Sequence, residues 1–185
     1  EGSYFTINRA RQFGKTTTMD SLFRLLSDKY FMIKISFEGL GEDDYREGRL
    51  FLAEFQKILV KKIKTVSPDL ADFWKTPALS FGDLSQKVYD FCKLVNKPVV
   101  LMIDEVDKSQ NNQLFLDLLG MLRNLYLERS ESGDMHSTFH SVILAGVYDV
   151  KNLKIKLRPD EERKYNSPWN IAAKFNVDMT FHPDE

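Results

Sequence analysis

Three consecutive residues, Gly14, Lys15 and Thr16, have types and an order that suggest a specific chemistry. They fill the second half of the phosphate-binding loop pattern G-x-x-x-x-G-K-[ST]. In such a loop, backbone N–H groups bind phosphate oxygens, the lysine supplies charge between the β- and γ-phosphates, and the threonine hydroxyl binds Mg²⁺. Arg9 stands where the first glycine of the pattern belongs. The motif alone is therefore weak, and its alternative is a helix start that happens to carry lysine and threonine.

A pair of acids, Asp104 and Glu105, follows the continuous apolar run of residues 99–103. Ligands of open parallel sheets bind at the carboxyl ends of the strands. Burying carboxylates beside such a strand costs free energy unless a cation or hydrogen-bond donors bind them. We predict that Asp104 holds Mg²⁺, directly or through water, and that Glu105 polarises the attacking water. The alternative is a solvated pair of acids in a turn. This alternative is less favoured because the phosphate-loop residues and the acids occur in the expected order along the chain and on the expected elements.

Glu105 also distinguishes between classes of nucleotide-binding protein. A hydrolase needs a group that orients water, whereas a small-molecule kinase must keep water away from the phosphate. A GTPase is expected to show Asn-Lys-x-Asp after a later strand, but Asn96-Lys97 lacks the aspartate and precedes the acidic strand. The sequence therefore favours binding and hydrolysis of ATP with Mg²⁺.

Other candidates for nucleotide contact flank these two motifs. Arg11, beside the loop, either contacts phosphate through its guanidinium or forms a structural ion pair. Asp149, or Tyr148 before it, follows a later apolar strand and is a candidate sensor of the γ-phosphate, with an ordinary loop turn as the alternative. The full set of residues that we expect to contact the nucleotide is Arg11, Gln12, Phe13, Gly14, Lys15, Thr16, Thr17 and Asp149.

The spacing of hydrophobic residues predicts the elements that position these side chains. Short β-branched, aromatic or continuous apolar runs predict strands, and apolar residues three or four apart predict helices. The predicted strands are residues 4–8, 31–37, 99–103, 141–147 and 175–181, and the predicted helices contain residues 19–26, 52–63, 84–95 and 114–125. Strands that alternate with helices imply an α/β fold, with a parallel sheet of about five strands and helices on both faces.

Composition limits the class of protein further. The 185 residues fit a single domain, because no repeat or linker separates a second one. Lysine plus arginine (26) nearly balance aspartate plus glutamate (27), so no overall field favours DNA or an anionic membrane. No apolar run is long enough to cross a bilayer. The single cysteine, Cys92, cannot form an internal disulfide and is expected in the core. We expect a cytoplasmic protein, and a chain that starts without methionine suggests a fragment of a longer one.

The ordered series of motifs resembles the predicted AAA-ATPase-like family of bacterial proteins, a branch of the AAA+ and STAND NTPases. The resemblance spans nearly the whole chain and rests on the segments YFTINRARQFGKTT, YFMIKISFEGL, VVLMIDEVDK, SVILAGVYDVKNL, SPWNIAAKF and FNVDMTF. Arginine in place of the first loop glycine is usual in that family, so Arg9 agrees with it. The resemblance implies a P-loop NTPase core of the RecA/AAA+ type. It also implies ATP at Lys15 and Thr16, Mg²⁺ at Thr16 and Asp104, and Glu105 as the base that orients water.

Many members of that family also carry a C-terminal PD-(D/E)XK nuclease-like domain, which residues 1–185 do not contain. We therefore expect no nuclease activity from these residues, and contact with nucleic acid only through domains outside them. Assembly into a homo-oligomer stays open. The alternative to an ATPase that acts as a switch or motor is a non-hydrolysing nucleotide-binding or protein-interaction module.

Overall fold

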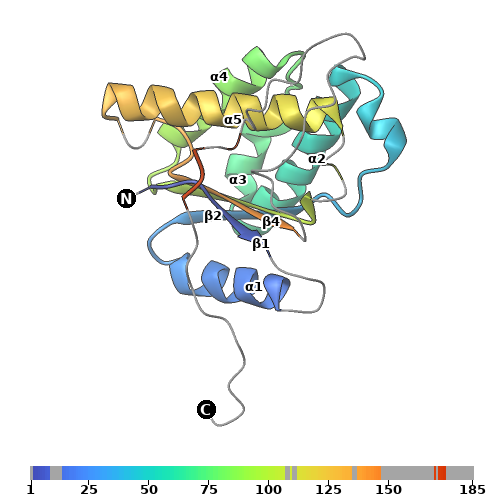
Figure 1. Cartoon of the computed structure of the whole chain (residues 1–185). Coiled ribbons are helices and arrows are strands. Elements are labelled where there is room, and N and C mark those ends of the chain that lie inside the picture. Colours follow the sequence, from blue (N-terminus) through green and yellow to red (C-terminus); the bar gives the residue numbers. More distant parts are fainter. Residues whose placement is uncertain are drawn as a thin grey trace.

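The structure is a computed structural model. It describes residues 2–8, 14–106, 109, 112–134, 137–146, 169 and 171–173. These residues form an α/β arrangement in which a parallel sheet lies between helices (Figure 1). The fold class expected from the sequence is therefore confirmed.

Four strands form the sheet in the order β1-β4-β3-β2, and every neighbouring pair is parallel. The strands are β1 (Phe5–Asn8), β2 (Phe31–Ser36), β3 (Val99–Asp104) and β4 (Ser141–Gly146). The two central strands, β3 and β4, are buried at every residue, which explains their continuous apolar sequences. A parallel bridge between Phe5 and Ala173 extends the pairing beyond β1. The fifth predicted strand, residues 175–181, lies outside the described residues.

Helices cover both faces of the sheet, as predicted, but unequally (Figure 1). One face carries α1 (Lys15–Leu26). The other face carries α2 (Gly48–Val66), α4 (Phe81–Leu94) and α5 (Gln113–Ser132). Three short elements were not predicted, because a single turn shows no hydrophobic period: the 3-10 helices η1 (Glu42–Tyr45) and η2 (Asp72–Lys75) and the helix α3 (Pro68–Ala71).

Successive residues of β2, β3 and β4 alternate between two separate hydrophobic clusters. In β3, Leu101 and Ile103 belong to the larger cluster, under α2, α4 and α5. Met102 belongs to the smaller cluster, together with Met19 of α1. Because side chains alternate along a strand, Asp104 lies on the same face of the sheet as Met102. The packing of β3 therefore directs this carboxylate to the α1 side.

A buried arginine joins the last turn of α5 to two other segments. Arg129 is 1% exposed. Its guanidinium donates hydrogen bonds to the backbone carbonyls of Phe139 and His140, both at 2.6 Å, and to that of Gly2. The guanidinium also lies over the ring of Tyr126, 5.2 Å from its centroid. Arg129 thus connects the start of the chain, α5 and the segment that leads into β4.

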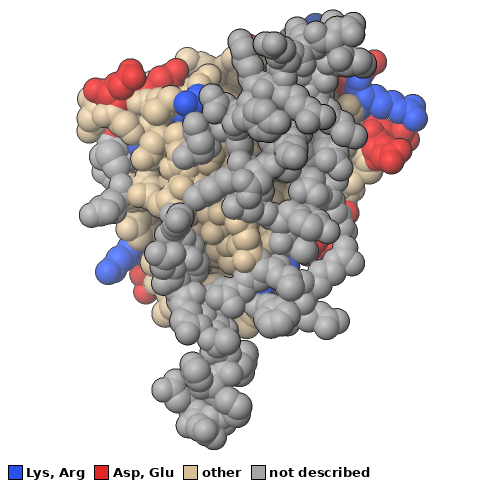
Figure 2. All heavy atoms as spheres, in the orientation of Figure 1, with Lys and Arg blue, Asp and Glu red and all other residues tan. Residues whose placement is uncertain are grey.

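One face of the molecule carries described charges of both signs (Figure 2). On the face in Figure 2, basic and acidic side chains lie beside each other at the margins, with uncharged residues between them. This agrees with the net charge of −1 for the chain. Among the helices in the described ranges, none combines the length and the apolar character that crossing a bilayer requires.

Candidate functional site

The first turn of α1 begins after a glycine with left-handed backbone. Gly14 has φ 72° and ψ 16°, and its carbonyl accepts a hydrogen bond from Thr18 N at 2.8 Å. A Cβ atom built on Gly14 would meet no atom within 4 Å. Glycine is therefore required here for the backbone conformation and not for lack of space. The first turn of α1 contains no acidic residue, so none of its own side chains opposes an anion at the positive end of the helix dipole.

Lys15 is the first residue of α1, and it is only 8% exposed. Lysine is rarely buried to this degree, because its ammonium group is strongly hydrated in water. Thr17, in the same turn, is exposed. The other residues predicted in this loop, Arg11, Gln12 and Phe13, lie outside the described residues, as do Arg9, Tyr148 and Asp149.

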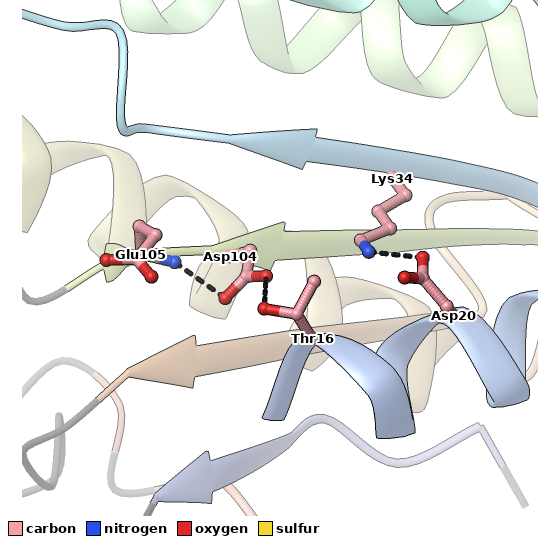
Figure 3. A network of polar contacts seen from close by, with 5 residues as sticks. All are labelled: Thr16, Asp20, Lys34, Asp104 and Glu105. Carbon is pink, nitrogen blue, oxygen red and sulfur yellow. Dashed lines mark hydrogen bonds and ion pairs between the residues drawn. The ribbon is translucent and has the colours of Figure 1, made fainter. Parts of the chain in front are cut away.

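The central contact of the site joins α1 to the end of β3. Thr16 Oγ1 donates a hydrogen bond to Asp104 Oδ2 at 3.1 Å, across a sequence separation of 88 residues (Figure 3). Asp104 is 4% exposed, and its other oxygen, Oδ1, accepts a hydrogen bond from Glu105 N at 2.9 Å. Both carboxylate oxygens therefore have a donor, which offsets the cost of burying the charge. The structure thus brings the predicted loop threonine to the predicted metal-binding aspartate.

Glu105 has an unusual backbone conformation. Its φ is 58°, and it is the one non-glycine residue with positive φ in the described ranges. For a residue with a Cβ atom this conformation costs about 1–2 kcal/mol, and such strain is concentrated at functional sites. The N–H of this strained residue donates the hydrogen bond to Asp104 Oδ1, so the strained backbone directly adjoins the Asp104 carboxylate.

A cavity of about 410 Å³ opens beside the acid pair, between α1, β2 and the last turn of α2. Its lining includes Thr16, Asp104 and Glu105, and it also includes Asp20 of α1 and Lys34 of β2. The last two form an ion pair of 2.5 Å between Lys34 Nζ and Asp20 Oδ1. Neither was predicted, although Asp20 follows Thr16 by one helical turn and Lys34 is the one charged residue in an apolar strand.

The oxygen atoms of Thr16 and Asp104 suit Mg²⁺, which prefers oxygen ligands. Within the described ranges, no group of three or more histidine, cysteine, aspartate or glutamate side chains gathers that could hold a metal by itself. Mg²⁺ is commonly held by one or two protein oxygens together with phosphate oxygens and water. The donor set therefore fits a metal that arrives with a phosphate ligand.

The parallel sheet and the meeting of Thr16 with Asp104 define the class of protein: a P-loop NTPase fold, the nucleotide-binding type of α/β sheet. The chain belongs to the AAA-like domain family, whose model matches residues 1–159. No match was found among curated proteins.

The chain is similar to two solved structures at low scores. The first is the Aeropyrum pernix ORC1 protein in complex with DNA, with a TM-score of 0.49 and 12% identity, over 78% of this chain and 33% of the ORC1 chain. The second is a KaiC-like protein from the archaeon Pyrococcus horikoshii, with a TM-score of 0.42 and 12% identity, over 93% of this chain and 70% of the other. This chain thus spans about a third of the ORC1 protein. At these scores the likeness adds nothing to the family assignment.

Proposed function

We propose that this chain is the nucleotide-binding core of a longer protein that hydrolyses ATP with Mg²⁺ as a molecular switch or motor. One observation carries the proposal: Thr16 Oγ1 lies 3.1 Å from Asp104 Oδ2, where the positive end of α1 meets the carboxyl end of a central strand. Helix N-termini and strand ends of this kind are the places where α/β proteins bind phosphates.

In this proposal the start of α1 binds the phosphates. Backbone N–H groups after Gly14 face the phosphate oxygens, and the left-handed conformation of Gly14 sets their direction. Lys15 supplies positive charge to the same oxygens. Arg11, Gln12, Phe13 and Thr17 complete the contacts with ATP, and Asp149 senses the γ-phosphate.

Thr16 and Asp104 hold the metal, and Glu105 orients the attacking water. Bound Mg²⁺ supplies neutralising charge to the β- and γ-phosphates. Glu105 is half-buried and lies next to Asp104, and it lines the cavity where a water molecule has room. A carboxylate in this position accepts a hydrogen bond from water and aligns it for attack on phosphorus.

The decisive experiment measures ATP-dependent thermal stabilisation with and without Mg²⁺, followed by phosphate release. The wild-type protein should be stabilised by ATP, and more strongly with Mg²⁺. Lys15→Ala should lose most of this stabilisation, whereas Lys61→Ala, at an exposed position of α2, should keep it. Because Lys15 is buried, the quantity to compare is the shift that ATP produces in each variant and not the melting temperature itself.

Glu105→Gln tests the catalytic step within the same experiment. The amide keeps the size of the side chain but is a far poorer acceptor, so ATP binding should persist while phosphate release falls by about a hundredfold or more. Equal phosphate release by the two proteins would rule out the role given to Glu105. Stabilisation by ATP without phosphate release from the wild type would instead identify a non-hydrolysing nucleotide-binding module.

A further inference from the structure

A second polar contact joins α1 to the sheet beside the contact between Thr16 and Asp104. It is the ion pair between Lys34 of β2 and Asp20 of α1, at 2.5 Å (Figure 3). The Lys34 side chain is 21% exposed and that of Asp20 51% exposed. An ion pair with this exposure adds little to the free energy of unfolding. Its main effect would therefore be on the orientation of α1 relative to the sheet.

The two contacts have the same spacing along the helix and along the strands. Asp20 follows Thr16 by four residues, which places both on one face of α1 about 6 Å apart along its axis. Lys34 precedes Ser36 by two residues, about 6.6 Å along β2, and Ser36 is the register partner of Asp104. A helix held by both contacts has its direction relative to β2 and β3 fixed, whereas one contact alone would leave it free to pivot.

Apolar packing lies beneath α1, and just past its last residue Lys97 Nζ donates hydrogen bonds to the carbonyls of Ser27 and Asp28. The cluster beneath α1 is the smaller of the two and consists of apolar side chains, with Met19 as the fully buried residue that α1 contributes. Apolar packing is not directional, so it resists rotation of α1 less than a hydrogen-bonded ion pair does. The Lys34–Asp20 pair is therefore well placed to orient the helix.

We infer that Lys34 and Asp20 are positioning residues: by fixing the orientation of α1, they hold the Thr16 hydroxyl against Asp104 and so set the contribution of Mg²⁺ to ATP binding. This inference rests on the proposed function. It concerns the metal-dependent part of binding, because Thr16 and Asp104 are the proposed metal ligands, whereas the N–H groups that contact phosphate belong to α1 itself.

The test compares ATP affinity with Mg²⁺ and with EDTA in wild type, Lys34→Met and Asp20→Asn. The ratio of the two affinities should fall by about two- to fivefold in each variant, the range expected for losing one partly exposed ion pair. The affinity in EDTA should stay unchanged. A double variant with the charges exchanged, Asp20→Lys with Lys34→Asp, should recover most of the ratio, which a merely structural loss would not allow.

The control is a matched lysine–aspartate pair away from the site. Lys75 and Asp72 form an ion pair of 2.6 Å in η2, with side chains 66% and 68% exposed, so Lys75→Met should leave the ratio unchanged. If wild type binds no ATP, the proposed function itself fails. Suppose that ATP binding by the wild type depends on Mg²⁺. The positioning role is then wrong if Lys34→Met keeps the full ratio of the two ATP affinities, or if the charge-exchanged double variant does not recover it.

Discussion

At the scale of single residues, the candidate site contains two residues with positive φ, one on each side of the Thr16–Asp104 contact. Gly14 adopts this conformation at little cost, and Glu105 adopts it against the preference of its own side chain. Gly14 directs the first N–H groups of α1, and the Glu105 N–H occupies one oxygen of Asp104. The two residues with positive φ therefore each adjoin a residue of the candidate site, Lys15 and Asp104.

Gly14→Ala should separate backbone strain from function when it is compared with Gly133→Ala. Gly133 ends α5 with φ 71°, and a Cβ at either glycine meets no atom within 4 Å. Both variants should therefore lose about 1–2 kcal/mol of unfolding free energy in denaturant titrations. Only Gly14→Ala should also weaken ATP binding, by about tenfold or more, as expected for losing a charge-assisted hydrogen bond. Equal ATP affinity in the two variants would contradict the role of Gly14.

At the scale of elements, the sequence predicted the strands and long helices well, because their signals are local. The run at residues 99–103 predicted β3 to within one residue, and its two acids indicated the edge of the sheet where the site lies. The distance between Thr16 and Asp104 could not be predicted, since a motif gives order along the chain and not separation in space. Lys34 and Asp20 were missed for the same reason: each is ordinary in its own element, and only the packing of α1 on β2 brings them together.

Arg129 is a further residue that no local pattern indicates, and its replacement should be strongly destabilising. Arg129→Met removes the donor to three backbone carbonyls and should lower the unfolding free energy by about 3 kcal/mol in denaturant titrations. Arg129→Lys should recover less than half of this loss, because a single ammonium group cannot span three acceptors.

Arg24→Met is the control for this prediction. Arg24 is also in the last turn of its helix, α1, but it is exposed, so its loss should change stability by less than about 0.5 kcal/mol. If Arg129→Met lowered the unfolding free energy as little as Arg24→Met, the hydrogen bonds of Arg129 would be unimportant for the stability of the fold.

At the scale of the whole molecule, the larger cluster buries two groups that ionise only in alkaline solution. Burial raises the pKa of the Tyr4 hydroxyl and of the Cys92 thiol above their ordinary ranges. Both groups are protonated in the folded and the unfolded chain at neutral pH. As the pH rises, the unfolded chain releases these protons first, and the folded state loses stability relative to it.

The unfolding free energy should therefore be insensitive to these two groups below about pH 8 and should fall above it. The cysteine contribution begins near pH 8.5 and the tyrosine contribution near pH 10, each with a slope of about 1.4 kcal/mol per pH unit. Denaturant titrations between pH 7 and 10.5 on wild type and Cys92→Ala measure the difference, since the variant should lack the earlier decline. Identical pH profiles would show that the thiol is not held protonated by the fold.

The unequal packing on the two faces of the sheet affects which part of the domain opens locally. The strand that carries Asp104 is embedded in the larger cluster, whereas the helix that carries Thr16 rests on the smaller one. Segments with less buried apolar surface open locally at lower free energy, so α1 should part from the sheet while the rest stays intact. A ligand that bridges Thr16 and Asp104 would stabilise the packing of α1 on the sheet. Dissociation of that ligand would allow α1 to open without unfolding of the larger cluster.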